Sequence, residues 1–311
     1  FDAQLARYNT LGTYCILTGN ISQAYEHYRQ AVQLWKSSPV LIAERSSQYR
    51  RYLLNYLNCL LDSPNEKEFT AVINDIKTLP ASFSEPENTT RATIWNIELL
   101  YHLNHGHLRK GALVIAEIEQ NILRYARNFP RVALMTLHYN CTVFYFLSGN
   151  YRKTLDYINL LLNERHGELK RDLQEFAHVL GIVAHYELCN VDILDNMIRS
   201  TKRFLKQRET QRVLEYIVLK TIQSLLSSAD KDSTRRIFRA LYADLVALLH
   251  EAPDQELPGL PELLFWTKSK LLQESIHEVF TTTMQTARGQ SYHEMFPPDI
   301  TSTTQRHKKR L

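Results

Sequence analysis

Three histidines near the middle of the chain have the residue type and spacing that come closest to a chemical site. His102 and His105 lie one helical turn apart, and His107 follows two residues later. Histidine is a common zinc ligand, and three of them could form a metal site with one open position. His105 and His107 flank Gly106, however, and the same loop contains no carboxylate or cysteine. We therefore predict that these are exposed turn residues and that the chain has no metal site.

The cysteines offer a second candidate. His185 and Cys189 lie four residues apart on one predicted helix face and could supply two metal ligands. The four cysteines of the chain are widely spaced and form no CxxC pair: Cys15, Cys59, Cys141 and Cys189. This pattern is typical neither of a disulfide framework nor of a zinc knuckle. We predict free, mostly buried thiols in a reducing compartment, with a structural role for Cys189.

Sequence motifs of catalysis and phosphate binding are absent. The chain has no GxxxxGK[ST], GxGxxG, GxSxG or HExxH segment. The closest acid pair, Glu117 and Glu119, would point to different faces of a helix. A hydrolase-like activity would need a buried histidine of shifted pKa beside a nucleophile, which no motif indicates. We predict that the protein is not an enzyme, has no catalytic residue and takes no cofactor.

Glycine and proline are scarce, which indicates long helices joined by few loops. The chain has 9 glycines and 10 prolines among 311 residues, about 3% of each against typical values of roughly 7% and 5%. Apolar residues recur at helical spacing almost throughout, as in the series Ala24, Tyr28, Ala31, Leu34 and Trp35. Such helices bury their apolar faces only against neighbouring helices. The sequence therefore predicts an all-α protein.

The turns between the predicted helices repeat along the chain. Four of them, each between two apolar helical segments, are centred on Gly19, Gly106, Gly149 and Cys189. Successive members of this set are 87, 43 and 40 residues apart, and polar breaks at 62–65 and 228–230 continue the same period. Regular helical hairpins of this kind indicate a repeat array. We predict an α-α superhelix, or solenoid, of five to six antiparallel helical hairpins.

The first hairpin resembles the tetratricopeptide repeat. The matching positions are Leu11-Gly12, Gly19, Ala24, Tyr28, Ala31 and Leu34. The likeness recurs with losses at Trp95 and Gly106, at Tyr145 and Gly149, and at Leu180-Gly181. The period of about 43 exceeds the 34 residues of that family. Armadillo and HEAT repeats have a closer period but lack the Leu-Gly, turn-glycine and alanine pattern.

The resemblance implies a concave groove lined by the first helix of each hairpin. Carried to this chain, the groove positions are Asn9, Thr13, Asn96, Tyr139, His178, His185 and Tyr186. Asparagine can bond both the N–H and the C=O of a peptide backbone. The charged clamp of heat-shock co-chaperones is not present in that arrangement. We therefore expect a non-catalytic scaffold that binds a protein or peptide segment in this groove.

The alternative function is a ligand- or peptide-sensing regulatory module whose effector domain lies outside this chain. The chain begins at Phe1 without a methionine, and on this basis we expect a further region before it. Some bacterial regulators contain similar arrays that close around a small effector. This alternative predicts a deep, partly apolar pocket and a change in compactness when the ligand binds.

Charge points away from nucleic acid as a partner. Lysine and arginine total 37 and aspartate and glutamate 33, a net charge of +4 that is too small for a general nucleic-acid binder. Four cations from 199 to 206 lie on one predicted helix face: Arg199, Lys202, Arg203 and Lys206. We expect Ile198, Thr201 and Leu205 to face inward. This basic face could bind an acidic partner, a phosphate group or nucleic acid, or it could form an ordinary solvated surface.

The end of the chain is expected to differ from the repeats. We predict one repeat domain over 1–288, in which a single amphipathic helix from about 262 to 284 caps the last hairpin. Before it, residues 251–261 with three prolines read as a loop. Residues 289–311 form a polar, basic tail. No run of 18 apolar residues is present, so we expect no membrane partner. The reducing compartment inferred from the cysteines predicts a cytoplasmic location.

Overall fold

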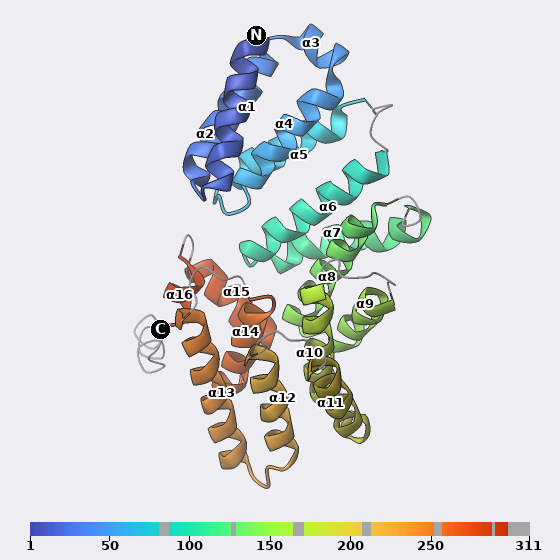
Figure 1. Ribbon diagram of the computed structural model, residues 1–311, viewed down its shortest axis with the longest axis vertical. Helices are drawn as coiled ribbons and strands as arrows, with labels where there is room; N and C mark the ends of the chain where they lie inside the picture. Colours follow the sequence, from blue (N-terminus) through green and yellow to red (C-terminus); the bar gives the residue numbers. More distant parts are fainter. Residues whose placement is uncertain are drawn as a thin grey trace. The chain divides into compact units, whose positions relative to one another are not determined.

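The computed structural model describes residues 1–80, 87–125, 129–163, 171–206, 213–251, 257–287 and 290–297. In these ranges the regular structure is helical throughout and no strand is present (Figure 1). The prediction of an all-α protein is therefore confirmed. None of the helices within the described ranges combines the length and apolarity needed to cross a membrane. The chain divides into two compact units, residues 1–134 and residues 135–311, which we call the N-terminal and C-terminal units.

The N-terminal unit is a series of paired helices. Its elements are α1 (Asp2–Leu17), α2 (Ile21–Lys36), α3 (Pro39–Glu44), α4 (Ser46–Cys59), α5 (Glu66–Thr78), α6 (Glu87–Asn104) and α7 (Leu108–Tyr125). The next helix, α8 (Arg131–Leu147), begins in this unit and continues into the other. Helix α2 packs against both α1 and α4. The expected break at 62–65 is confirmed, since Asn65 Oδ1 accepts a hydrogen bond from Glu68 N and caps α5.

The C-terminal unit continues the pattern of paired helices. Its further elements are α9 (Tyr151–Asn163), α10 (Arg171–Glu187), α11 (Val191–Lys206), α12 (Val213–Leu226), α13 (Lys231–Glu251), α14 (Leu260–Leu272), α15 (Ile276–Thr286) and α16 (Tyr292–Met295). Helix α10 packs against α9, α11 and α12, and α13 packs against α12 and α14. The expected break at 228–230 is confirmed, and Asp230 Oδ1 accepts a hydrogen bond from Ser233 N at the start of α13.

Four turns between paired helices share one hydrogen-bonding pattern. In the first, Asn20 N donates to Cys15 O over 2.8 Å and Gly19 N donates to Ile16 O over 3.1 Å, the two bonds of a Schellman motif. Equivalent pairs of bonds close the turns at Gly106, Gly149 and Cys189. All four central residues have positive φ, including Cys189 at 56°. The sequence-based placement of Cys189 at a turn-glycine position is therefore confirmed.

The polar residue after each left-handed residue also begins the next helix. Asn20 Oδ1 accepts a hydrogen bond from Gln23 N, and Asn150 Oδ1 accepts one from Lys153 N, each over 3.2 Å. One asparagine therefore satisfies the end of one helix and the first turn of its partner. The two helices of such a hairpin are therefore joined by a turn of only three residues, 18–20 in the first case and 148–150 in the second.

Aromatic residues fill the core of the N-terminal unit. Trp35 is fully buried, and the rings of Phe1, Tyr49 and Tyr52 have their centroids 5.1, 5.5 and 6.1 Å from its own. Tyr28 lies against Gly12, where a Cβ atom would be only 2.8 Å from Tyr28 Cε2. The Leu-Gly pair of the first hairpin thus permits the close approach of α1 and α2.

The glycines at two repeat positions should respond oppositely to alanine. Gly12→Ala should lower the free energy of unfolding by about 1–3 kcal/mol, because the new methyl group overlaps the Tyr28 ring. Gly181→Ala should instead raise it by about 0.5–1 kcal/mol, because the nearest atoms, on Ile158, are 3.8 Å away. Urea unfolding followed by circular dichroism measures both. Equal effects of the two substitutions would contradict this packing.

The single helix expected from about 262 to 284 is wrong. The structure has two helices there, α14 and α15, separated at 273–275. Gln273 ends α14 with a left-handed φ of 59°, and Ser275 and Glu278 form a capping box that begins α15. The loop expected over 251–261 is also shorter, since Glu251 still belongs to α13 and Pro261 lies in the first turn of α14. The expected tail falls largely on residues outside the described ranges.

Candidate functional site

The predicted groove residues of the N-terminal unit lie on α1 and α6. Asn9 is half-buried and Thr13 is exposed on α1. Thr13 Oγ1 lies 3.0 Å from Tyr28 Oη in a hydrogen bond, and Asn55 Nδ2 of α4 donates to the same hydroxyl over 3.4 Å. Tyr52 Oη of α4 also donates to Leu5 O of α1 over 3.4 Å. The Tyr52 bond links α4 directly to α1, and both of these helices pack against α2.

Asn96 is used differently. Its Nδ2 donates to Ala92 O of its own helix over 3.1 Å and to Ala133 O of α8 over 3.3 Å. The amide hydrogens of Asn96 thus hold the beginning of α8. Its contribution to packing makes Asn96 a poor position for separating binding from stability.

Three of the predicted groove residues in the C-terminal unit contact residues outside their own helix through their side chains. The His178 ring is 4.8 Å from the ring of Phe204 on α11, and Tyr186 makes an edge contact with Trp266 on α14. His185 Nδ1 is 3.0 Å from Asn190 Nδ2. Tyr139 on α8 is half-buried. Burial lowers the pKa of His185 and raises that of Tyr186.

The basic face on α11 has the predicted orientation. Ile198, Thr201 and Leu205 are buried, as expected. Arg199 donates to Asn196 Oδ1 and Lys202 to Gln223 Oε1, each over 2.7 Å. Arg203 and Lys206 are exposed. Residues 207–212, which follow this face in the sequence, lie outside the described residues.

A polar row on α4 was missed by the sequence analysis. It follows one face of the helix at helical spacing and comprises Gln48, Arg51, Asn55 and Asn58. The second hairpin matches the repeat pattern by period alone, so no groove position was carried onto it. The spacing of these four residues was the available signal.

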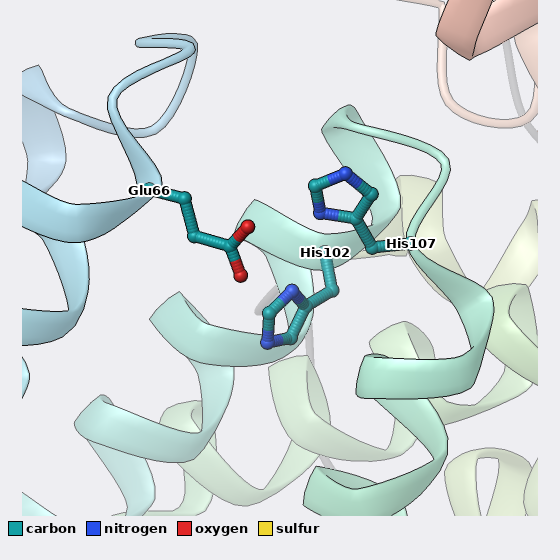
Figure 2. A group of neighbouring side chains, drawn as sticks. All are labelled: Glu66, His102 and His107. Carbon is teal, nitrogen blue, oxygen red and sulfur yellow. The ribbon is translucent and has the colours of Figure 1, made fainter.

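The three central histidines are half-buried, so their expected exposure at the turn is wrong. His102 lies in the last turn of α6, and His107 immediately precedes α7. Glu66, the first residue of α5, reaches the same place (Figure 2). One ligand atom from each of these three side chains lies within 4.8 Å of the others. We call Glu66, His102 and His107 the histidine–glutamate cluster.

Contacts around this cluster fix the loop before α5 onto the end of α6. Tyr101 Oη donates to Ser63 O over 3.1 Å, and Asn104 Nδ2 donates to Asp62 Oδ1 over 2.9 Å. The Tyr101 ring stacks on that of Phe69 at a centroid distance of 3.8 Å. The carboxylate of α5 is therefore held near the α6–α7 turn by packing as well as by charge.

Burial and charge set the protonation of the cluster. Burial, reinforced by the neighbouring His107, lowers the pKa of His102 to about 4. A hydrogen bond from Lys110 lowers the pKa of Glu66, against the effect of burial. Glu66 also forms an ion pair with this Lys110. Near neutral pH the cluster therefore contains a neutral imidazole beside an ionised carboxylate.

His105 is excluded from the cluster by its own contacts. Its Nδ1 lies 2.8 Å from Tyr101 O, and its ring stacks on the Tyr101 ring at 4.2 Å. The other candidate pair of ligands was His185 and Cys189. His185 contacts Asn190 through Nδ1, whereas Cys189 occupies the left-handed position of the turn. None of the four cysteines is in a disulfide: Cys189 is exposed, while Cys15, Cys59 and Cys141 are buried. The prediction of free, mostly buried thiols is confirmed.

Function must be argued from these side chains. In comparisons with known proteins, no family model matches the chain, and no curated protein or solved structure is significantly similar to it.

Proposed function

We propose that this protein is a non-catalytic, tetratricopeptide-like helical scaffold that binds a protein or peptide segment along the first helices of its hairpins. The observation that carries the proposal is the exposed side of α1 beside the polar row of α4. This surface, which we call the α1–α4 face, belongs entirely to the N-terminal unit.

The exposed side of α1 is poor in charge. Its two charged residues, Asp2 and Arg7, lie in the first half of the helix. The rest of the surface includes small and uncharged polar residues: Ala6, Asn9, Thr10 and Thr13. At its far end, Tyr14 is 64% exposed and Leu17 is 81% exposed. Exposed apolar residues next to uncharged polar ones are typical of protein-binding surfaces.

The polar row of α4 supplies the hydrogen-bonding part of the face. Asn55 already points toward α1, since it donates to the hydroxyl of Tyr28 that Thr13 also contacts. Amide side chains can donate to a peptide C=O and accept from a peptide N–H. Arg51 is exposed in the same row and favours an acidic group on the partner. An extended segment with an apolar residue near Leu17 and an acidic residue near Arg51 fits this chemistry.

The test compares two double variants matched in chemistry. Random peptides displayed on phage are selected against the full chain, and the affinity of the selected peptides is measured by fluorescence polarisation. Asn9→Ala with Arg51→Ala removes one amide and one cation from the first helices. It should weaken binding by about tenfold or more, as loss of two polar contacts predicts.

The control removes one amide and one cation from the second helices, with Gln30→Ala on α2 and Lys67→Ala on α5. Both residues are exposed, so the control should not change the melting temperature. The melting temperature of the Asn9→Ala, Arg51→Ala variant is measured alongside it, because Asn9 is half-buried. The control should keep the parent affinity. Equal weakening by both variants, or by neither, would overturn the α1–α4 face as the binding surface.

A further inference from the structure

We propose that the histidine–glutamate cluster is a binding site for a divalent transition-metal ion, with Zn²⁺ as the expected species. Glu66 supplies a carboxylate oxygen, and His102 and His107 each supply one imidazole nitrogen. The inference stands apart from the proposed peptide-binding function, because the cluster and the α1–α4 face share no residue.

The geometry of the cluster is close to that of a zinc site. Ligand atoms from its three side chains lie within 4.8 Å of one another. Ligands of a tetrahedral zinc ion lie about 3.4 Å apart, given zinc–nitrogen bonds of about 2.0–2.1 Å. Figure 2 shows the Glu66 carboxylate directed toward both imidazoles from a different helix.

The chemistry of the three ligands selects the class of ion. Two imidazoles favour zinc, cobalt, nickel or copper over magnesium and calcium, which prefer oxygen ligands. Two histidines and one glutamate leave the fourth position of a tetrahedral ion for water or another donor.

An independent observation comes from His102. Its Nδ1 is buried and has no hydrogen-bond partner among the described residues. A buried polar atom without a partner costs roughly 1–3 kcal/mol. A metal ion bound at Nδ1 would supply the missing partner and so remove this cost.

Lys110 is the competitor of the metal. Its ammonium group forms an ion pair with Glu66, and a second cation cannot occupy the same space unless this group withdraws. The Lys110 side chain is 49% exposed, so it can turn toward solvent when the ion binds. Removing the lysine charge should therefore strengthen metal binding, which a purely structural role of the cluster would not predict.

The experiment uses the full chain without a histidine tag, stripped with EDTA and then dialysed free of it. Zn²⁺, Co²⁺ and Mg²⁺ are added separately. Zinc at about 100 times its dissociation constant should raise the melting temperature by roughly 5–10 °C. Cobalt should give the visible absorption of a four-coordinate ion. Magnesium should do neither.

Four single variants locate the site. His102→Gln should weaken cobalt binding by about 100-fold, and Glu66→Gln should weaken it at least about tenfold. Even the outer partners of metal ligands contribute roughly 10- to 100-fold to metal affinity. His105→Gln is the matched control and should bind as the parent does. Lys110→Met should bind more tightly than the parent.

Other outcomes overturn the proposal. Equal loss of affinity in His105→Gln and His102→Gln would mean that the turn binds metal nonspecifically. A second contrary outcome is full metal binding in His102→Gln together with loss of binding in a double variant, His250→Gln with His293→Gln. The ion would then lie at His250 and His293 of the C-terminal unit, whose ring centroids are 5.2 Å apart. No binding of zinc or cobalt by the parent would remove the site altogether. None of these results depends on whether peptides bind the α1–α4 face.

Discussion

Gly259→Ala should lower the free energy of unfolding of the C-terminal unit by about 2–5 kcal/mol, the sum of a left-handed backbone cost and an overpacking cost. Gly259 has a φ of 85° at the start of α14. A Cβ atom there would lie 1.7 Å from Cζ of Phe176, a residue that is only 1% exposed. The buried ring cannot withdraw without opening the contact between α10 and this turn. Urea unfolding followed by far-ultraviolet circular dichroism measures the loss.

Gly149→Ala separates the two costs. Gly149 has a similar φ of 73°, but a Cβ atom there would have only Ile276 Cγ2 nearby, at 3.6 Å. This control should cost about 1–2 kcal/mol, the backbone cost alone. Phe176→Leu should recover part of the stability of Gly259→Ala, because the smaller side chain leaves room for the methyl group. Equal losses at the two glycines would refute the contact between Gly259 and Phe176.

Glu187→Ala should lower the free energy of unfolding of the same unit by about 2–4 kcal/mol, since it leaves the buried Trp266 N–H unpaired and removes the ion pair with Lys270. Glu187 Oε1 accepts from Trp266 Nε1 over 2.8 Å, and Oε2 accepts from Lys270 Nζ over 2.6 Å. The Glu187 side chain is 9% exposed and Trp266 is fully buried. This carboxylate joins the end of α10 to α14. The melting temperature and the urea midpoint should both fall.

Two comparisons test this explanation. Glu187→Gln keeps an acceptor for the indole N–H and should cost less than alanine. Glu26→Ala removes a surface ion pair with Arg29, in which the Glu26 and Arg29 side chains are 49% and 42% exposed, and should change stability far less than Glu187→Ala does. If Glu187→Ala costs no more than Glu26→Ala, the bonds to Trp266 and Lys270 do not stabilise the unit.

The turns were the most predictable part of the fold. A residue with positive φ, followed by a helix-capping polar residue, is a local arrangement, and its signal lies in two or three adjacent residues. For this reason even Cys189, which is followed by the polar Asn190, could be placed at a glycine position of the repeating turns. The division of the final helix had a local signal too, the Ser275–Glu278 capping box, which the apolar periodicity on either side concealed.

Long-range contacts set the limit of prediction. Nothing near Gly259 in the sequence reveals that Phe176 lies against it. Glu66 likewise stands 36 residues before His102, so a search confined to the histidine loop could not find it. The predicted turns at 62–65 and at Gly106 did contain a clue. Turns within successive antiparallel hairpins lie at the same end of their helices, which brings the start of α5 near the start of α7.

The shared asparagines at the hairpin turns have a consequence for the order of folding. Because Asn20 and Asn150 each end one helix and begin its partner, a hairpin of some 35 residues contains its own closing interactions. Contacts between residues close in sequence form quickly, since little chain entropy is lost in closing the loop. Folding can therefore nucleate at more than one hairpin, and α1–α2 and α8–α9 are two places where it can begin.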